Sequence, residues 1–344
     1  MTKKRIKTAI LSAVLAAILL TVGILMMVAN SQNDRRQPTE ELSNWMSMIK
    51  DGTPLKRVVI PGAHDAGTKG LIYLAETQNK DTAAMLACGT RYLDLRVAKT
   101  KSGELKIYHG SFKGVTLDSV LDQIVEFLSK NPTEMLILDF QHFDGDAEQD
   151  TKDKVLSTLD VIRAVGDYVE FVDNLTLGEA RGKCLVLWGA DSADGEVFLR
   201  RNNDEGTLEH TALQSYYYSD LNKKSSSAYV KEALPYYIEL YKEQGAGLFV
   251  LQGQLTDGLF VFGPRFREAT HVKNMNDYVE RLKNSADLGV INIVMRDYVT
   301  PYKNCLTLQL NATKGNVKVD CAEAFELMIA QNLGYVQSTT IYCE

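Results

Sequence analysis

The stretch that decides the fold is residues 58–65, VVIPGAHD. Its first three residues form an apolar run typical of a short buried strand, and Pro61-Gly62 ends that run. His64 and Asp65 follow directly. In parallel α/β folds, the side chains that perform chemistry lie at the carboxyl ends of the strands. The segment therefore predicts a strand with a candidate site at its end.

Seven further apolar segments have the length of buried parallel strands, and helical patterns lie between several of them. Together with residues 58–60, the strand-like segments are 92–97, 105–108, 135–140, 184–188, 213–217, 248–252 and 291–295, and the helical patterns cover 117–128, 226–244, 274–288 and 322–331. This alternation predicts a (βα)8 TIM barrel of the α/β class. We expect an irregular barrel, because 92–97 and 105–108 leave almost no chain for a helix between them.

A second histidine, His109, directly follows the segment 105–108. An imidazole titrates near neutral pH, so one ring can accept a proton while a second, charged ring donates one. Asp94 and Arg96 lie between the two histidines in sequence, and a guanidinium is suited to holding a phosphate. His64, His109 and Arg96 together indicate cleavage of a phosphodiester.

Five motifs of the chain occur in the order found in one known family. They are Ile60 to Asp65, Gly89 to Arg96, Tyr108 to Gly110, Asn131 to Glu134 before 135–140, and Ile293 to Tyr298. At these residues the chain resembles the X domain of phosphatidylinositol-specific phospholipase C, especially the metal-independent bacterial enzymes and the X-domain-only proteins. The resemblance extends from about residue 42 to the C-terminus.

The resemblance implies a role for each matched side chain. His64 corresponds to the general base that removes the proton of the inositol 2-hydroxyl, and His109 to the general acid that protonates the departing diacylglycerol oxygen. Asp297 corresponds to the carboxylate that orients the base, and Asp65 to the one that supports the acid. A carboxylate beside an imidazole fixes its tautomer and stabilises its cation.

Arg96 stands where the bacterial enzymes place a phosphate-binding arginine and the eukaryotic signalling enzymes a calcium-binding carboxylate. Asp94, two residues earlier, belongs to the same catalytic group by this resemblance. A guanidinium offers several fixed donors to phosphate oxygens and needs no cofactor. We therefore expect neither a metal nor another cofactor.

The candidates for substrate binding are Gln141, His142, Ser215 and Tyr217. Ser215 aligns with an aspartate that binds inositol hydroxyls in the bacterial enzymes, and a neutral hydroxyl makes a weaker hydrogen bond than a carboxylate. Gln141 and His142 lie where those enzymes carry a lysine. A structural role for His142 is the alternative to a role as a ligand.

Residues 8–29 form an apolar stretch of 22 residues without a charge, preceded by four basic residues. Such a stretch is long enough to span a bilayer, and the basic flank favours a cytoplasmic N-terminus. A cleaved signal peptide is the alternative. In both interpretations the rest of the chain lies outside the cytoplasm, either anchored to the membrane or secreted. The expected organisation is an anchor or signal at 1–30, a polar linker at 31–41 and the barrel at 42–344.

The net charge is −6, and because residues 1–30 hold four basic and no acidic side chains, the remainder carries −10. An acidic body argues against nucleic acid as a partner and limits membrane contact to local apolar surfaces. Aromatic residues in two predicted loops are candidates for that contact. They are Tyr216, Tyr217 and Tyr218 where the segment 213–217 ends, and Phe260, Phe262 and Phe266 in the loop after 248–252, with ordinary loop packing as the alternative. We expect a monomer that acts at the membrane surface on phosphatidylinositol or a related inositol phospholipid.

The five cysteines show no spacing typical of a metal site. Cys88 and Cys184 lie in apolar runs typical of core thiols. Cys305 and Cys321 are a candidate for an extracellular disulfide, with two free thiols as the alternative.

The first prediction for function is a phosphatidylinositol diacylglycerol-lyase, which releases diacylglycerol and inositol 1,2-cyclic phosphate. The first alternative is another phosphoric diester hydrolase on the same barrel, acting on a glycosylated inositol lipid or a glycerophosphodiester. The second is a catalytically silent lipid-binding module. Such a module would normally have lost a catalytic imidazole, and this chain has both.

Overall fold

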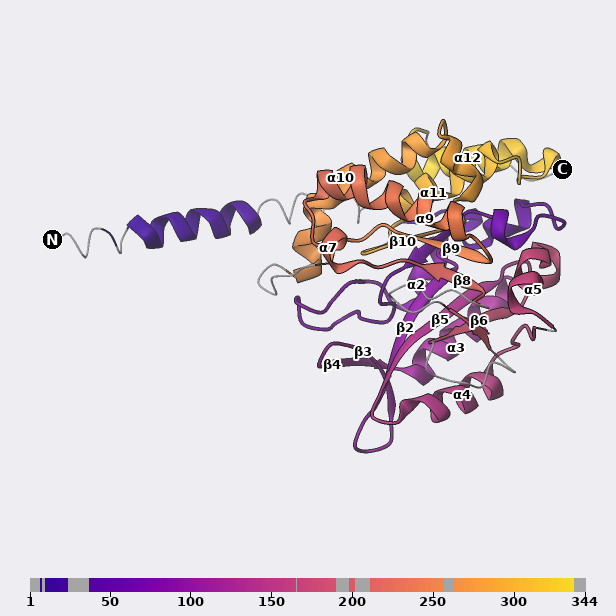
Figure 1. Cartoon of the computed structure of the whole chain (residues 1–344), viewed down its shortest axis with the longest axis horizontal. Helices are drawn as coiled ribbons and strands as arrows, with labels where there is room; N and C mark the ends of the chain where they lie inside the picture. Colours follow the sequence, from indigo (N-terminus) through magenta and orange to yellow (C-terminus); the bar gives the residue numbers. More distant parts are fainter. Residues whose placement is uncertain are drawn as a thin grey trace.

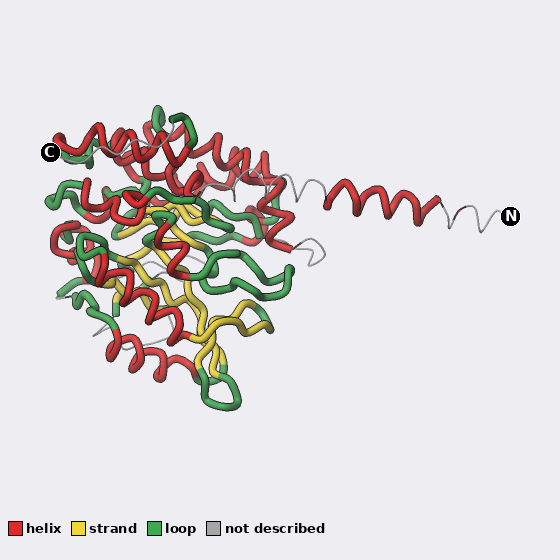
Figure 2. Tube along the Cα trace, turned by 180° about the vertical axis from the view of Figure 1, so that it is seen from behind, coloured by secondary structure: helices red, strands yellow, loops and turns green. Residues whose placement is uncertain are grey.

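Eight parallel strands form a nearly closed barrel with helices packed around it (Figures 1 and 2). The computed structural model describes residues 7, 10–23, 37–164, 166–189, 198–201, 211–256 and 263–336. The strands follow one another around the barrel in the order β7-β6-β5-β2-β1-β10-β9-β8. The predicted α/β barrel is therefore confirmed at the level of its architecture.

The strands of the barrel are short, as expected for a parallel sheet covered on both faces. They are β1 (Ile60–Ala63), β2 (Tyr92–Lys99), β5 (Leu136–Asp144), β6 (Cys184–Trp188), β7 (Leu199–Arg200), β8 (Leu213–Ser215), β9 (Leu248–Gln252) and β10 (Ile293–Arg296). Two further strands, β3 (Leu105–His109) and β4 (Phe112–Thr116), lie off this path and pair with β2 and with each other.

The helices fill the connections between the strands. The α-helices are α2 (Thr82–Ala87), α3 (Leu117–Lys130), α4 (Ala147–Thr158), α5 (Tyr168–Asn174), α6 (Leu177–Ala180), α7 (Ser219–Asn222), α8 (Ser226–Ala228), α9 (Leu234–Gln244), α10 (Gly263–Leu282), α11 (Pro301–Thr313) and α12 (Ala322–Leu333). The shorter helical turns are η1 (Glu40–Met48), η2 (Leu55–Arg57), η3 (Tyr229–Ala233), η4 (Ala286–Val290) and η5 (Val319–Cys321).

The prediction that residues 105–108 form a barrel strand is wrong. β3 pairs antiparallel with the end of β2 and then with β4, so it belongs to a hairpin that leaves the barrel (Figure 1). Only five residues separate β2 from β3, and a parallel return needs a crossover of a dozen residues or more. The eighth barrel strand is instead β7, which is two residues long.

The barrel closes between β7 and β8 through a single bridge. Arg201 pairs with Leu213 in parallel, and the Ala212 amide donates to the Arg200 carbonyl at 2.8 Å. The other neighbouring barrel pairs from β6 round to β8 share between two and seven paired positions. The β7–β8 junction is therefore the weakest part of the barrel wall.

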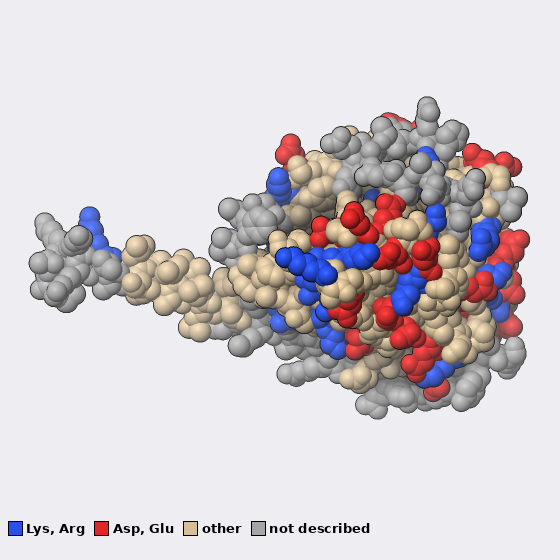
Figure 3. Space-filling view, turned by 90° about the horizontal axis from the view of Figure 1, so that it is seen from below, with Lys and Arg blue, Asp and Glu red and all other residues tan. Residues whose placement is uncertain are grey.

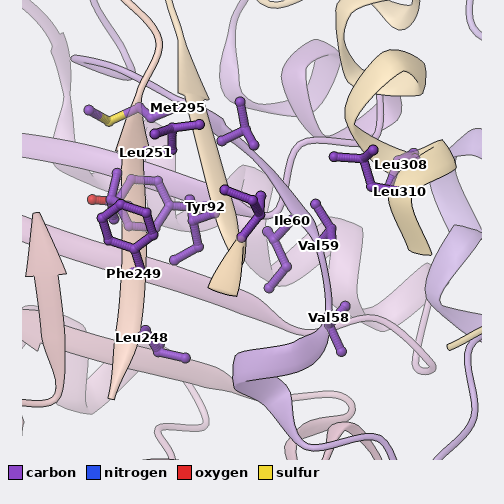
Figure 4. Packing of buried hydrophobic residues seen from close by; sticks show 14 of the residues in the cluster. Val58, Val59, Ile60, Tyr92, Leu248, Phe249, Leu251, Met295, Leu308 and Leu310 are labelled. Carbon is purple, nitrogen blue, oxygen red and sulfur yellow. The ribbon is translucent and has the colours of Figure 1, made fainter. Parts of the chain in front are cut away.

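The barrel is filled and covered by apolar side chains. Tyr92, Phe249 and Met295 lie together inside the strands, and Leu308 of α11 covers the outside of β1 (Figure 4). Gly62 allows this packing, because a Cβ there would lie 2.9 Å from Cδ1 of Tyr92. A side chain at Gly62 would thus push β1, and the His64 that follows it, away from β2.

The helical patterns 117–128, 226–244 and 322–331 are confirmed, whereas 274–288 falls on the end of α10 and on η4, with a turn between them. Helix α11 is among the helices that were not predicted. α10 begins at Gly263 rather than near residue 274, so Phe266 lies in a helix and not in a loop. α11 carries no clear apolar stripe in the sequence because nine of its 13 residues are buried. A helix buried on several sides loses the one-sided pattern on which the prediction depended.

Arg91 and Glu134 belong to two of the matched motifs but lie away from the carboxyl ends of the strands, where they form a buried ion pair. Nη2 of Arg91 lies 2.7 Å from Oε2 of Glu134, and both side chains are fully buried. The Glu134 carboxylate also accepts from the Met46 amide. This pair therefore ties η1 to the amino ends of β2 and β5, opposite the candidate site.

The N-terminal segment is described only in part. Residues 10–23 are helical, with 10–21 exposed, and they extend away from the barrel in Figure 1. Among the helices that the structure describes, none has both the length and the apolar character needed to cross a bilayer. The rest of the predicted 8–29 segment lies outside the described residues.

The predicted disulfide between Cys305 and Cys321 is wrong. Cys305 is a free, buried thiol on α11, where it faces Cys88 in the core. Burial raises the pKa of the Cys305 thiol, which is also unfavourable for oxidation. Cys321 is disulfide-bonded, and its partner lies outside the described residues. Cys88 and Cys184 are free and buried, as predicted.

Charges of both signs are interspersed on the face drawn in Figure 3, where acidic side chains gather near the middle. Several exposed lysines pair with neighbouring carboxylates, as Lys154 does with Asp118. On this face, at least, the charge distribution differs from the continuous basic surface that nucleic-acid binding uses.

Candidate active site

A polar cavity of about 250 Å³ opens at the carboxyl ends of the strands. Its walls carry His64, Asp65, Asp94, Arg96, His109, Gln141, His142, Tyr217, Gln252, Gln254, Thr256 and Met295. Eight of these were predicted from the sequence as catalytic or binding residues. The barrel thus brings together side chains that lie more than 150 residues apart in the chain.

His64 lies between two carboxylates at the end of β1. Its Nδ1 is 2.7 Å from Oδ1 of Asp297, which follows β10. Its Nε2 is 3.3 Å from Oδ2 of Asp65. Strands β1 and β10 are neighbours paired in register, so His64 and Asp297 face each other at the same level of the barrel.

Asp65 is the centre of the ionic network. Its Oδ1 lies 2.8 Å from Nε of Arg96, and its Oδ2 lies 3.6 Å from Nε2 of His109. The same Oδ2 contacts His64, so one carboxylate oxygen lies between the two imidazoles. Nδ1 of His109 lies 2.9 Å from the Ala75 carbonyl; if that nitrogen carries the proton, it donates there and Nε2 faces the cavity.

These contacts shift the pKa values of the charged groups. Burial opposes the charged form of His64, but the charges of Asp65 and Asp297 outweigh it and raise its pKa to about 9. Burial also opposes the charged form of Asp65, yet Arg96 and the nearby imidazoles lower its pKa. Burial and the charge of Asp65 raise the pKa of Asp94. At neutral pH the site therefore holds a charged His64 beside an ionised Asp65.

The backbone is strained in the two turns that directly follow His64 and Asp297. Asp65 has φ 44° and Tyr298 has φ 46°, and they directly follow His64 and Asp297. Non-glycine residues enter this left-handed region at a cost of about 1 kcal/mol or more, and they do so often at functional sites. The two turns aim the imidazole and its carboxylate at each other.

Gln78 holds these two turns together. Its Nε2 donates to the carbonyls of His64 and Arg296 at 2.9 Å each, and its Oε1 accepts from the Val299 amide at 3.0 Å. Gln78 is fully buried, so these bonds are shielded from water. The amide of this one side chain therefore fixes the end of β1 relative to the end of β10.

Lys303 supports the Asp297 turn from the other side. Its Nζ donates to the carbonyls of Asp297 and Tyr298 at 2.9 and 2.7 Å and pairs with Glu268. Neither Gln78 nor Lys303 was predicted. A polar residue in a loop or in a helix gives no sequence signal for such a contact.

The predicted binding residues fall into two groups. Gln141, His142 and Tyr217 line the cavity, but Ser215 does not. Ser215 is fully buried behind the wall, where its Oγ accepts from Nε2 of Gln252 at 3.0 Å.

Gln252, which contacts Ser215, and the neighbouring Gln254 both line the cavity. Oε1 of Gln252 accepts from Nε2 of Gln254 at 3.0 Å, and Oε1 of Gln254 is buried without a hydrogen-bond partner. The two glutamines were missed, although Gln252 ends a predicted strand. That position was the signal that could have identified it.

A second hollow of about 110 Å³ shares the two imidazoles with the polar cavity as part of its wall. His64, His109 and Asp297 form part of its wall, together with the apolar Leu74, Leu255 and Pro264. The two rings therefore border both the polar cavity and a second hollow with a more apolar wall.

The aromatic residues predicted to contact a membrane have different environments. Tyr216 is buried in the core, so its predicted surface role is wrong. Tyr217 lines the cavity, and Tyr218 is half-buried beside it. Phe260 and Phe262 lie outside the described residues.

Other apolar side chains are exposed near the site. Ile72 and Tyr73 are exposed in the loop that supplies the Ala75 carbonyl to His109. Contact of this loop with a membrane was not predicted, because one short apolar run in the sequence does not show which end of a barrel it occupies.

His64, Asp65 and Asp94 are the one group among the described residues whose spacing would suit a metal ion, with ligand atoms within 4.8 Å of one another. However, Asp65 is already paired with Arg96, and Oδ2 of Asp94 accepts from the Asp65 amide at 3.1 Å. A guanidinium therefore stands where a cation would need a third carboxylate.

Residues 52–187 match the family model described as the phosphatidylinositol-specific phospholipase C X domain. This segment contains every predicted catalytic residue except Asp297. Over these residues, which are less than half of its length, the chain is similar to the phosphatidylinositol-specific phospholipase C X-domain family.

Curated relatives carry the same resemblance. The chain is 33% identical over 177 residues to the 1-phosphatidylinositol phosphodiesterase of Listeria monocytogenes, an alignment that covers 46% of this chain and 53% of that protein. It is 29% identical over 153 residues to the enzyme of the same name from Staphylococcus aureus, covering 42% of this chain and 45% of that protein. The chain thus spans about half the length of the curated relatives that it matches.

Solved structures extend the similarity to most of the fold. The phosphatidylinositol-specific phospholipase C from Listeria monocytogenes matches with a TM-score of 0.62 at 22% identity, over 78% of this chain and 98% of that chain. The Staphylococcus aureus enzyme matches with a TM-score of 0.59 at 18% identity, over 80% of this chain and 98% of that chain. At these identities the likeness concerns the fold.

Proposed function

We propose that the chain is a phospholipase C that cleaves phosphatidylinositol, or a related inositol phospholipid, into diacylglycerol and inositol 1,2-cyclic phosphate. One observation carries this proposal. Two imidazoles contact the same oxygen of Asp65, and a guanidinium contacts the other oxygen, all on one cavity wall. This arrangement supplies a base, an acid and an anion site within reach of one phosphorus atom.

In the first step the 2-hydroxyl oxygen of inositol attacks phosphorus. His64 takes the hydroxyl proton at Nε2, a new O–P bond closes the cyclic phosphate, and the P–O bond to glycerol breaks. His109 gives a proton from Nε2 to the glycerol oxygen. The nucleophile belongs to the substrate itself, which raises its effective concentration to the order of 10⁵ M or more. Slow hydrolysis of the cyclic ester follows with the roles of the histidines exchanged.

The free site holds a proton on His64, whereas the reaction needs it on His109. Asp65 Oδ2 provides the route, because it lies 3.3 Å from one Nε2 and 3.6 Å from the other. When Arg96 turns to the substrate phosphate, Asp65 loses its strongest partner and becomes a better proton acceptor. Substrate binding thus moves the proton from the base toward the acid.

The two ends of the substrate bind in different hollows. The polar cavity takes the inositol ring, with Gln141, Gln252 and Gln254 as partners for its hydroxyls. The more apolar hollow beside the imidazoles takes the glycerol end of the leaving group. In this proposal that end faces a membrane surface, which the exposed apolar side chains of Ile72 and Tyr73 support.

We further propose that residues 1–30 anchor the enzyme or direct its secretion, so that the barrel acts outside the cytoplasm. The apolar segment 8–29 and its basic flank support this location.

The test is to incubate the full-length chain with phosphatidylinositol in detergent micelles containing a chelator and to follow the products by phosphorus NMR. The proposal predicts a cyclic phosphate signal that appears before any inositol 1-phosphate. His64→Ala and His109→Ala should each lower the rate by about 10²–10⁴-fold. Production of inositol 1-phosphate with no cyclic intermediate, or an unchanged rate in either variant, would contradict it.

A further inference from the structure

Residues 75–78 form a strap that reaches both imidazoles. At one end of the strap, Nε2 of Gln78 donates to the His64 carbonyl at 2.9 Å. At the other end, the Ala75 carbonyl lies 2.9 Å from Nδ1 of His109. A carbonyl can only accept, so this contact is a hydrogen bond when Nδ1 carries the proton, and it then turns Nε2 toward the cavity. The strap therefore contributes to the geometry of the base and of the acid.

The general acid depends on the strap more than the base does. The side chain of His64 is 14% exposed and has an independent contact of 2.7 Å with Asp297. The side chain of His109 is 26% exposed, and its Nε2 lies 3.6 Å from Asp65, beyond hydrogen-bond distance. The contact with the Ala75 carbonyl is thus the shorter of the two polar contacts that the described residues give this ring. A displacement of that carbonyl therefore affects the acid first.

Glu76, the second residue of the strap, connects it to α10. Its Oε2 pairs with Nη2 of Arg265 at 2.9 Å, and its Oε1 accepts from the Gly70 amide at 3.0 Å. Only 15% of the Glu76 side chain is exposed, so water and salt screen this pair less than they screen a pair on the open surface. The guanidinium of Arg265 also lies over the ring of Tyr298, 5.5 Å from its centroid. Arg265 therefore joins the strap to the turn that follows β10.

The same ion pair connects two segments that border the second hollow. Leu74 and Thr77 line this hollow from the loop that contains the strap, and Gly263 and Pro264 line it from α10. The start of α10 fits closely against the loop, because a Cβ at Gly263 would lie 2.8 Å from the carbonyl oxygen of Tyr73. The ion pair thus fixes the surroundings of the proposed leaving-group site, where the acid delivers its proton.

We infer that Arg265 is a positioning residue for the general acid: through Glu76 it holds the Ala75 carbonyl against Nδ1 of His109. Arg265 lines neither hollow, so it acts on turnover only through the strap. This inference rests on the proposed function, because a misplaced acid lowers turnover only if His109 protonates the leaving group. Proton transfer needs hydrogen-bond distance, and a misplacement of about 1 Å can cost on the order of 10²-fold in rate.

The test compares phosphatidylinositol in detergent micelles, whose leaving oxygen needs a proton, with nitrophenyl inositol phosphate, whose leaving group does not. Arg265→Gln should lower kcat about tenfold for phosphatidylinositol and stay within about twofold of the wild type on the nitrophenyl substrate. Glu76→Gln keeps the acceptor for the Gly70 amide but removes the charge, and it should repeat this pattern.

Two further variants separate the ion pair from a general effect on α10. Arg265→Lys keeps a cation beside Glu76 and should remain within about threefold of the wild type on both substrates. Arg281→Gln is the matched control, because Arg281 lies on the same helix over the ring of Tyr278, 5.9 Å from its centroid. It should change neither rate.

A second readout does not depend on turnover. In nitrogen NMR of the neutral His109 ring, the wild type should carry the proton on Nδ1, and Arg265→Gln should shift the ring toward the Nε2 tautomer. Equal losses on the two substrates, no loss on phosphatidylinositol, or an unchanged tautomer overturn the inference while the proposed function stands. If the wild-type chain cleaves neither substrate, the proposed function fails, and the tautomer alone decides the inference.

Discussion

Replacing Asp297 by asparagine removes one of the carboxylates that favour the charged form of His64. The rise of the His64 pKa from 6.5 to about 9 corresponds to about 3 kcal/mol of preference for the imidazolium. Asp297 contributes both its charge and the 2.7 Å contact with Nδ1, whereas Asp65 lies 3.3 Å from Nε2. An opposite charge at such distances shifts a pKa by about 1–3. We therefore expect His64 in Asp297→Asn to titrate about one to two pH units below the wild type.

The assay is a pH titration of the histidine ring signals by NMR, with the His64 signal assigned from its loss in His64→Gln. The matched control is Asp277→Asn, which removes an exposed carboxylate on α10 that pairs with Lys273. It should leave the His64 midpoint near 9. A midpoint in Asp297→Asn within about 0.3 of the wild-type value would refute the argument, because the geometry would then not set the charge of the ring.

The same contacts predict a pH-dependent difference in stability. Because the pKa of His64 is raised in the folded state, its contribution to the free energy of unfolding is complete below pH 6.5 and is lost as the pH rises through about 9. Urea unfolding should therefore show that the difference in stability between wild type and His64→Gln falls by about 3 kcal/mol over that range. A difference that stays constant with pH would contradict the shift. Arg96→Lys should lower kcat/KM by about 10²–10³-fold, since an ammonium cannot reproduce the fixed donors that face the phosphate, and a loss below threefold would exclude that role. A calcium chelator should leave the wild-type rate unchanged, and strong inhibition would mean that the His64, Asp65 and Asp94 group holds a metal. Gln78→Leu should destabilise the fold by about 1–3 kcal/mol and lower the His64 midpoint, because three buried backbone groups lose their partner, and a stability loss with an unchanged midpoint would limit Gln78 to a structural role.

Much of the fold follows from the sequence, because seven of the eight barrel strands are short apolar runs that only a buried sheet accommodates. The two misjudged segments have a shared cause. β3 is apolar enough to resemble a barrel strand, although its short link to β2 permits only a hairpin. β7 is two residues long and leaves no pattern at all. The lengths of these two segments and of the loops that connect them, rather than their amino-acid composition, decide whether they join the barrel.

The candidate site was similarly predictable where chemistry and motif coincide, at His64, Asp65, Arg96 and His109. The parts that were missed are those that depend on tertiary contact. Gln78 lies in an irregular loop, and its three hydrogen bonds exist only when β1 and β10 are side by side. The strand predicted over 213–217 ends at Ser215 instead, and Gln252 from the next strand covers that side chain.

The division of work between the two imidazoles can be measured directly with a substrate whose leaving group needs no proton. In an inositol phosphate bearing a nitrophenolate leaving group, the acid is dispensable while the base is not. We predict that His109→Ala cleaves this substrate within about tenfold of the wild-type rate, and that His64→Ala remains impaired by about 10²-fold or more on it. Equal impairment of the two variants on this substrate would contradict the assignment of His64 as base and His109 as acid.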